Sequence, residues 1–183
     1  MKIEIIRNSF SLYLDRDGVI NKKKENDYIK EWSEFKFTEG ALIAISILSK
    51  IFNKIIIVTN QRGIGKGVMS ENDLNEIHKK MIKKIESHNG RIDGIYFCAD
   101  LEDNSYCRKP NPGMAYDSKK DFYDINFNKS FMVGDQFSDV EFGHRLGMKT
   151  VLITSKKKIT GSQVPHYTFK SLLDFSKSIL NKH

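Results

Sequence analysis

The sequence is poor in cysteine, with only Cys98 and Cys107 among its 183 residues. Two cysteines in a chain from a reducing compartment are usually free thiols or metal ligands, and seldom a structural crosslink. From composition alone we therefore expect these two thiols to be free or metal-bound.

The sequence also lacks long hydrophobic runs. The longest apolar stretch is interrupted by Ser46 and Ser49, so no segment has the length needed to cross a bilayer. The first ten residues carry Glu4, Arg7 and Asn8 and contain no small-residue cleavage site, which is not the pattern of a signal peptide. We expect a cytoplasmic protein without a membrane partner.

Acidic residues are fewer than basic ones, 23 against 30, which gives a net charge of +7. A basic surface can bind nucleic acid by releasing counterions from the phosphate backbone. The lysines here occur in small groups without interleaved aromatic residues, at Lys22–Lys24, Lys79–Lys84 and Lys156–Lys158. We expect no nucleic-acid partner, although a positive field also attracts small anionic metabolites.

The length fits a single domain, residues 1–183, and the apolar content of 39% suits one core. Apolar β-branched runs alternate with amphipathic stretches, which is the pattern of a parallel sheet covered on both faces by helices. The predicted strands are Phe10–Leu14, Lys54–Val58, Gly94–Cys98, Ser130–Val133 and Thr150–Thr154. The predicted helices are Gly40–Phe52, one capped by Ser70, one opened by Asn111-Pro112, one near Phe137–Leu146, and Ser171–Leu180.

Polar side chains follow the ends of these predicted strands. In a parallel sheet the carboxyl ends lie at one edge, where doubly wound folds build their sites. The clusters that should meet there are Asp15 with Asp17, Thr59 with Asn60, Cys98, and Asp135.

The first cluster is the pair Asp15 and Asp17. Side chains two apart in an extended segment point the same way, so both acids face one site while Arg16 points elsewhere. One carboxylate can attack phosphorus, and the other can transfer protons to the leaving oxygen and from water. Because the two carboxylates repel each other, we expect Mg²⁺ beside them. Taken alone, the pair is equally consistent with a capped turn.

Two further clusters suit phosphate binding. Thr59 and Asn60 open a glycine-rich loop whose backbone amides can hold phosphate oxygens, although the spacing is not that of a P-loop. Lys109 precedes a proline-rigidified helix start and can neutralise a transferring phosphoryl group, and Arg108 can bind another anionic group bidentately. Singly, each cluster could also be an ordinary surface loop.

The fourth cluster is Asp135 with Asp139. Asp135 directly follows a hydrophobic strand and a glycine, which suits a metal ligand. Asp139 lies one helical turn further on. It either orients a ligand water or Lys109, or is a first-turn acid favoured by the helix dipole.

In this order the four clusters resemble the haloacid dehalogenase (HAD) superfamily of phosphotransferases. The forms of Leu14–Asn21, Val58–Gln61 and Cys107–Met114 are similar to those of the D-glycero-D-manno-heptose 1,7-bisphosphate phosphatase family. Histidinol-phosphate phosphatase domains share most of these motifs. The resemblance covers nearly the whole chain.

The resemblance implies an α/β, Rossmann-like three-layer sandwich with a central parallel sheet and a minimal or absent cap. It implies Asp15 as the nucleophile, Asp17 as the acid/base and Lys109 as the stabiliser of developing charge. Mg²⁺ would bind Asp15, the backbone carbonyl of Asp17, and Asp135. The predicted substrate-binding residues lie in the strand-end loops and in a small flap after Asn21; they are Thr59, Asn60, Gln61, Arg62, Arg108, Glu25, Asn26, Asp27, Tyr28 and Gln136.

Two departures from the family pattern concern a zinc loop and one lysine. The family has Cys-x-His and then Cys-x-Cys, whereas this chain has Cys98-Ala99-Asp100 and Ser105-Tyr106-Cys107. Since a structural zinc site needs four good ligands, we expect no zinc and a loop held by packing or by a Cys98–Cys107 pair. Gln136 stands where the family has a lysine. We expect the loss of that positive charge to weaken a contact with phosphate or to change which sugar is preferred.

The expected activity is removal of the C7 phosphate of a heptose bisphosphate by a monomeric, Mg²⁺-dependent enzyme through an aspartyl-phosphate. The alternatives are a histidinol-phosphate phosphatase, a nucleic-acid 3'-end phosphatase and a non-catalytic binding domain. The complete set of catalytic residue types argues against the last of these.

Overall fold

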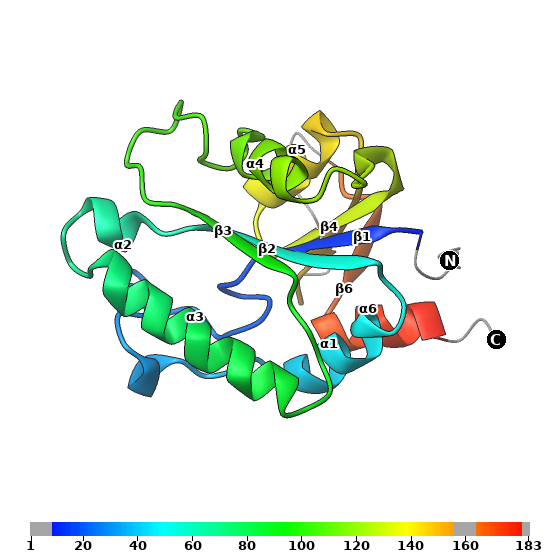
Figure 1. Ribbon diagram of the computed structural model, residues 1–183, viewed down its shortest axis with the longest axis horizontal. Helices are drawn as coiled ribbons and strands as arrows, with labels where there is room; N and C mark the ends of the chain where they lie inside the picture. The colour runs from blue at the N-terminus through cyan, green and yellow to red at the C-terminus, as the bar shows by residue number, and fades with distance from the viewer. Residues whose placement is uncertain (1–8, 156–163, 181–183) are drawn as a thin grey trace.

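The computed structural model describes residues 9–155 and 164–180. The described strands form one six-stranded, all-parallel sheet in the order β3-β2-β1-β4-β5-β6 (Figure 1). The strands are β1 (Ser11–Leu14), β2 (Lys54–Asn60), β3 (Gly94–Cys98), β4 (Ser130–Gly134), β5 (Lys149–Ile153) and β6 (Tyr167–Phe169). The helices are α1 (Ala41–Ser49), α2 (Arg62–Gly65), α3 (Glu71–Glu86), α4 (Gly113–Asp121), α5 (Phe137–Arg145) and α6 (Leu172–Leu180), with 3-10 turns η1 (Trp32–Glu34) and η2 (Phe127–Lys129).

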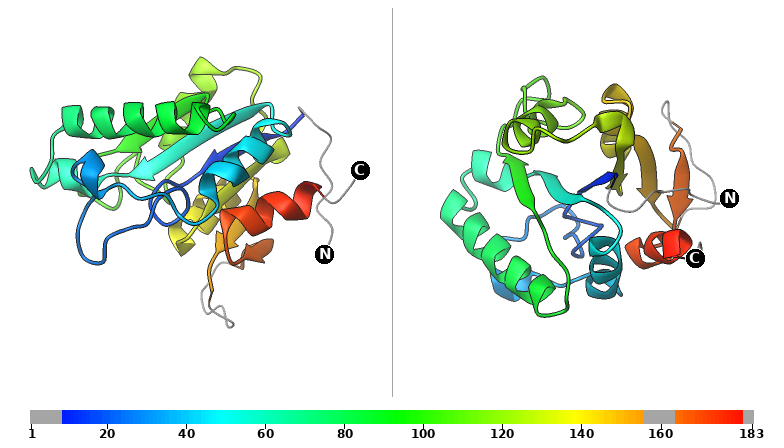
Figure 2. Two further views of the ribbon diagram at one scale, coloured as in Figure 1. Left: turned by 90° about the horizontal axis from the view of Figure 1, so that it is seen from below. Right: turned by 45° about the vertical axis from the view of Figure 1, so that its right-hand side comes forward.

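Helices cover both faces of the sheet (Figures 1 and 2). Leu12 and Leu14 of β1 belong to the apolar core beneath α1, α3 and α6. Tyr13, which alternates with them, belongs to the core beneath α4 and α5. Strands buried on both faces read as continuous apolar runs, which is why the central strands could be predicted from sequence. The predicted three-layer α/β fold is confirmed.

Most predicted elements are present with shifted ends. The Thr150–Thr154 strand begins one residue earlier, and α4 begins at Gly113 with Pro112 as its N-cap. Ser70 caps α3 as predicted, because its hydroxyl accepts from the Asp73 amide while the Asp73 carboxylate accepts from the Ser70 amide. The short helix α2 and strand β6 were not predicted.

The connections that follow β1 and β3 contain little regular structure. Residues 15–40 include only the turn η1 as a helical element, and residues 99–112 include neither helix nor strand. This is the arrangement expected of a minimal cap. None of the helices in the described ranges combines the length and the apolar character that crossing a bilayer requires. The signal-peptide interpretation rests mainly on residues 1–8, which lie outside the described residues, and a single domain over 1–183 stays a prediction.

Candidate active site

Three acids converge at the carboxyl edge of the sheet. Asp15, Asp135 and Asp139 each place a carboxylate oxygen within 4.8 Å of the others. The pairing of β1 with β4 explains this, because Leu14 is in register with Val133 and the Asp15 amide donates to the Val133 carbonyl at 2.9 Å. The acids that follow these two neighbouring strands are therefore brought side by side.

Lys109 is the cation at the centre of this group. Its buried ammonium donates to Asp15 Oδ1 at 2.7 Å and to the Val58 carbonyl at 2.8 Å, and lies 2.6 Å from Asp139 Oδ1. Burial alone would lower the pKa of Lys109, but Asp139 and Asp15 outweigh it and raise that pKa. Lys109 therefore stays charged and fixes the position of the Asp15 carboxylate.

Asp15 is buried, with 7% of its surface exposed. Burial raises its pKa to about 7, Lys109 opposes the rise, and the negative charges of Asp139 and Asp17 add to it. A carboxylate of this kind gains strongly from any further positive charge placed beside it. This is the electrostatic setting in which a hard cation is stabilising.

Asp17 is close to Asp15 in sequence but is held by different partners. Its carboxylate accepts from Arg16 at 3.1 Å, from Asn21 Nδ2 at 2.9 Å and from Gln61 Nε2 at 2.9 Å. Burial acts to raise the pKa of Asp17, but the charge of Arg16 and these hydrogen bonds lower it overall. The expectation that Arg16 merely points elsewhere is incomplete, because its guanidinium turns back to Asp17.

Asp139 combines both roles that the sequence left open. One oxygen pairs with Lys109, and the other accepts from the Gln136 amide at 3.0 Å at the start of α5. The same carboxylate therefore caps a helix and orients the buried lysine. With both oxygens engaged, Asp139 is less available than Asp15 or Asp135 as a metal ligand.

These acids line a cavity of about 230 Å³ at the sheet edge. A larger groove of about 670 Å³ lies between α3 and β3, but none of the three convergent acids lines it. We take the smaller cavity as the site, because reactive groups from four segments meet there. Its lining residues are Asp15, Asp17, Lys23, Thr59, Asn60, Lys109, Asp135, Gln136, Ser138 and Asp139.

Thr59, Asn60 and Gln136 line the cavity, and the side chain of each has a hydrogen-bond partner within the protein. The Asn60 side chain accepts from the Lys109 amide at 3.0 Å and donates to the Lys109 carbonyl at 3.2 Å. It thereby fixes the loop that carries the lysine. Gln136 donates to Asp135 Oδ2 at 3.0 Å.

The other predicted substrate-binding residues are not among those that line the cavity, and their contribution to substrate binding stays a prediction. Gln61 is buried behind Asp17. Arg62 and Arg108 both donate to the exposed Asp103, at 2.7 Å and 3.0 Å, so an acid that the sequence analysis overlooked holds both guanidinium groups. The hydrogen bond from Arg108 and the charge of Arg62 lower the pKa of Asp103.

The flap after Asn21 makes contacts mainly within itself and with neighbouring loops. Glu25 and Asn26 are exposed. Asp27 pairs with Lys24 and Lys30, and Tyr28 packs beneath Lys66. None of these four predicted flap residues lines the cavity. Lys23, which was not predicted, lines the cavity and contacts Asp135. Its only sequence signal was membership of the Lys22–Lys24 group.

Gly18 is needed for the close approach of Asp135. Its φ of +92° is in the left-handed region, and a Cβ at this position would lie 2.3 Å from Asp135 Oδ2. A side chain at residue 18 would therefore occupy the space beside the acids.

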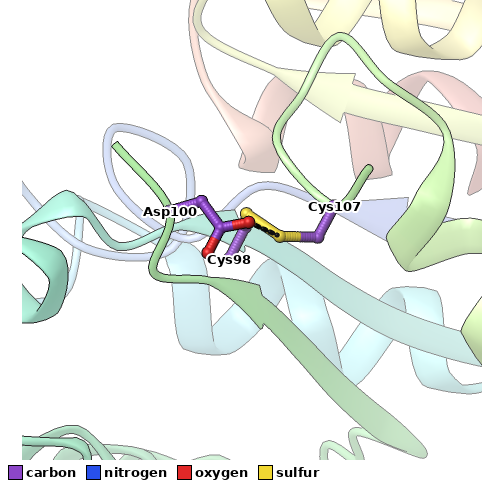
Figure 3. A group of neighbouring side chains, drawn as sticks. All are labelled: Cys98, Asp100 and Cys107. Atoms are coloured by element: carbon purple, nitrogen blue, oxygen red, sulfur yellow. Dashed lines mark hydrogen bonds between the residues drawn. A yellow bond between two sulfur atoms is a disulfide. The ribbon is translucent and has the colours of Figure 1, made fainter. Parts of the chain in front are cut away.

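The loop before Lys109 contains a disulfide between Cys98 and Cys107 (Figure 3). The composition-based expectation of free or metal-bound thiols is wrong, and the alternative of a Cys98–Cys107 pair is confirmed. The Cα atoms are 5.4 Å apart, a spacing suited to a crosslink. Asp100 lies 3.4 Å from the Cys107 sulfur, and Ser105 lies 3.7 Å from the Cys98 sulfur, so the four positions of the family's zinc loop still cluster. A disulfide sulfur has no proton, so the contact with Asp100 is not a hydrogen bond.

Known proteins are similar to this chain in both sequence and fold. The HAD-hydrolase-like family model matches residues 106–175. The D-glycero-beta-D-manno-heptose-1,7-bisphosphate 7-phosphatase of Neisseria meningitidis serogroup A is 36% identical over 180 residues, covering 94% of this chain and 95% of the relative. The D-glycero-alpha-D-manno-heptose-1,7-bisphosphate 7-phosphatase of Mycobacterium tuberculosis is 33% identical over 183 residues, covering 98% and 96%. The chain belongs to the HAD-like heptose-bisphosphate phosphatase family.

Solved structures of this phosphatase family have the same fold. The D,D-heptose 1,7-bisphosphate phosphatase of B. bronchiseptica, complexed with magnesium and phosphate, aligns with a TM-score of 0.83 and 27% identity over 95% of this chain and 99% of that one. The enzyme from Burkholderia thailandensis aligns with a TM-score of 0.68 and 28% identity over 94% and 99%. Both alignments span the whole phosphatase architecture described above.

The acids of this family member fit a hard divalent cation. Asp15 and Asp135 bring carboxylate oxygens together beside Gly18, whose missing Cβ leaves room at Asp135. Carboxylate oxygens are the ligands that Mg²⁺ prefers. The ammonium of Lys23 already lies against Asp135, which shows that this edge attracts positive charge.

Proposed function

We propose that the protein is a Mg²⁺-dependent phosphatase that removes the C7 phosphate of D-glycero-D-manno-heptose 1,7-bisphosphate through an aspartyl-phosphate on Asp15. The observation that carries this proposal is the convergence of Asp15, Asp135 and Asp139 within 4.8 Å, with Lys109 bonded to Asp15 at 2.7 Å. Relatives at 33–36% identity over almost the entire chain carry this activity in their names.

Asp15 is suited to attack phosphorus because Lys109 fixes one of its oxygens and the sheet fixes its backbone. The bond between Asp15 and phosphorus forms as the bond from phosphorus to the sugar oxygen breaks. Asp17 gives the departing oxygen a proton, and then accepts one from the water that hydrolyses the aspartyl-phosphate. Because Arg16 and the hydrogen bonds to Asp17 lower its pKa in the free enzyme, Asp17 must take up its proton when the negatively charged substrate lies beside it. Lys109 stabilises the negative charge that builds up on the phosphoryl oxygens.

Asp15, the Asp17 backbone carbonyl and Asp135 are the groups that would hold Mg²⁺. When bound, the ion offsets the repulsion between the carboxylates and the phosphate. Thr59, Asn60 and Gln136 lie at the cavity and are candidates for contacts with substrate.

Replacement of the nucleophile tests the assignment. Asp15→Asn keeps the volume of the side chain but removes its ability to form the aspartyl-phosphate, so we expect C7 phosphate release to fall by at least about 10³-fold. Phosphate release is measured on the heptose bisphosphate, with circular dichroism as the check on folding. Turnover close to that of the unmodified enzyme would refute Asp15 as the nucleophile.

The substrate is tested with a panel of phosphate esters. We expect the highest kcat/KM on the heptose bisphosphate, with lower values on histidinol phosphate and on a 3'-phosphorylated oligonucleotide. A preference for the oligonucleotide that weakens steeply with salt would instead favour the nucleic-acid alternative.

We further propose that the enzyme is a monomer and that it acts in the cytoplasm. It would form one domain spanning residues 1–183 and have no nucleic-acid partner. Sedimentation at micromolar concentration and fractionation of cells test the first two points. A dimeric species at that concentration would contradict the monomer.

A further inference from the structure

A buried guanidinium lies between the two catalytic acids in sequence. Arg16 is 0% exposed, and a buried charge is costly unless it is paired and hydrogen-bonded. Its partners are the Asp17 carboxylate at 2.9 Å, Gln61 Oε1 at 3.3 Å and His78 Nε2 at 3.2 Å. Among the described residues, Asp17 is the only acid that forms a salt bridge with it.

His78 connects the Arg16 guanidinium to α3, and it lies 62 residues after Arg16 in the sequence. A guanidinium only donates hydrogen bonds, so Nε2 of the imidazole must accept and the ring must be neutral. Burial, and then the charge of Arg16, lower the pKa of His78 to about 3, which keeps the ring neutral in ordinary buffers. His78 is therefore a fixed acceptor for Arg16.

Gln61 completes the connection. Its amide nitrogen donates to Asp17 Oδ2 at 2.9 Å and to Thr59 Oγ1 at 2.8 Å, while its oxygen faces Arg16. The reverse orientation would place an NH₂ group against the guanidinium and an oxygen against the carboxylate, so only one orientation is stable. His78, Arg16 and Gln61 thus form one hydrogen-bonded chain that ends on Asp17.

We propose that His78, acting through Arg16 and Gln61, is a positioning residue that fixes the direction of the Asp17 carboxylate for proton transfer. The inference rests on the proposed function, in which Asp17 is the acid/base. Arg16 Nε already lacks a hydrogen-bond partner, so removal of the acceptor on α3 leaves a second buried N–H unpaired, and the guanidinium then shifts to find another partner. Because Arg16 bonds both Asp17 and Gln61, that shift moves two of the groups that hold the carboxylate.

The test compares two leaving groups. A sugar alkoxide needs a proton as it departs, whereas a p-nitrophenolate does not, so loss of acid catalysis slows the first far more than the second. The measurement is the single-turnover rate of leaving-group release from the heptose bisphosphate and from p-nitrophenyl phosphate. Asp17→Ala gives the full difference between the two substrates, expected to be about 10²-fold or more.

We expect His78→Phe to slow release of the sugar at least about tenfold and release of p-nitrophenolate less than about threefold. His78→Gln keeps an acceptor and should restore sugar release to within about threefold of the unmodified enzyme. His88→Phe, at an exposed histidine just beyond α3, is the matched control and should change neither rate. If His78→Phe does not fold, Gln61→Leu interrupts the same chain without altering α3 and should give the same selectivity.

Equal slowing of both substrates, or no slowing, in the folded His78→Phe or Gln61→Leu variant would overturn the positioning role while Asp17→Ala still discriminates. If Asp17→Ala itself fails to discriminate, the acid/base assignment of the proposed function is wrong and the positioning role is overturned with it. The inactivity of Asp15→Asn is independent of both results.

Discussion

At the scale of single residues, the site is organised by how each charge is partnered. Asp15 faces Lys109, Asp17 faces Arg16, and Asp135 faces Lys23. The Asp15–Lys109 pair is buried and the second pair has a buried guanidinium, whereas the Lys23 side chain is 48% exposed. Buried pairs are strongly coupled to their surroundings and exposed pairs are weak and readily exchanged. Lys23 is therefore the partner that can leave.

Lys23 competes with a metal ion for Asp135, and its removal should strengthen Mg²⁺ binding. Since exposed ion pairs contribute about 0.2–1 kcal/mol, Lys23→Ala should lower the Mg²⁺ dissociation constant by up to about fivefold. Calorimetric titration without substrate measures this, and Lys22→Ala is the matched control on an exposed neighbour. Weaker Mg²⁺ binding by Lys23→Ala would instead show that the lysine supports the metal site.

His78 makes stability depend on pH. Its pKa is about 3 in the folded chain against 6.5 when unperturbed, so between these values the unfolded chain takes up a proton that the folded chain does not. The stabilisation is present above pH 6.5 and is lost as the pH falls. Between about pH 7 and 5.5, the unfolding free energy should fall by about 1 kcal/mol more in the unmodified protein than in His78→Gln. Urea unfolding at both pH values measures this, and equal losses would contradict it.

At the scale of secondary-structure elements, α5 depends on an acid that the site also uses. Asp139→Ala removes the acceptor of the Gln136 amide and leaves buried Lys109 with one carboxylate fewer. We expect a loss of about 3–5 kcal/mol of unfolding free energy, the usual result of breaking a buried ion pair. Denaturant unfolding provides the measurement.

The control for this experiment is Asp174→Ala. Asp174 is an exposed acid in the first turn of α6, and its carboxylate accepts a hydrogen bond from the Ser171 hydroxyl. Its loss should cost about 0.5–1 kcal/mol. Equal effects of the two substitutions would mean that Asp139 matters to α5 alone and not to Lys109.

Elements with a strong local pattern were predictable from sequence. The β-branched, apolar run Lys54–Val58 predicted strand β2 at nearly the right place. The capping signal of Ser70 with Asp73 did the same for helix α3. Strand β6 has only Tyr167–Phe169, which is too short for a period to be recognised. Helix α2 contains Gly63 and Gly65, and glycine is unfavourable in helices.

The same distinction applies to the site. Asp15 and Asp135 could be placed together because parallel strands end at one edge, and the ladder enforces that geometry. The pairing of Arg62 and Arg108 with Asp103 connects the start of the short helix α2 with the irregular loop 99–112, for which no sequence period exists. The sequence analysis did not single out His78, since its partner Arg16 lies 62 residues earlier in the chain.

At the scale of the whole molecule, the disulfide joins the end of β3 to the loop that leads to Lys109. Purified protein kept from reductants should show no reactive thiol after denaturation, because Cys98 and Cys107 are its only cysteines. The double substitution Cys98→Ser with Cys107→Ser should lower stability by about 2–3 kcal/mol, the chain-entropy value for so short a loop. Two reactive thiols in the denatured chain would contradict the crosslink.

Zinc remains a separate question for this loop. A sulfur in a disulfide is not a thiolate ligand, so the oxidised protein should contain less than one zinc per chain by metal analysis. Stoichiometric zinc that is lost on Cys98→Ser substitution would refute this expectation.

The hydrogen bond from the Asp15 amide to the Val133 carbonyl has a practical consequence. That amide proton lies between the paired strands β1 and β4, so its exchange with deuterium requires these two strands to separate. An inactive variant in which this proton still exchanges slowly has kept its nucleophile in place and has lost chemistry alone. An inactive variant in which this proton exchanges fast has lost the pairing of β1 with β4. The exchange rate of a single amide proton therefore distinguishes a loss of chemistry from a loss of structure.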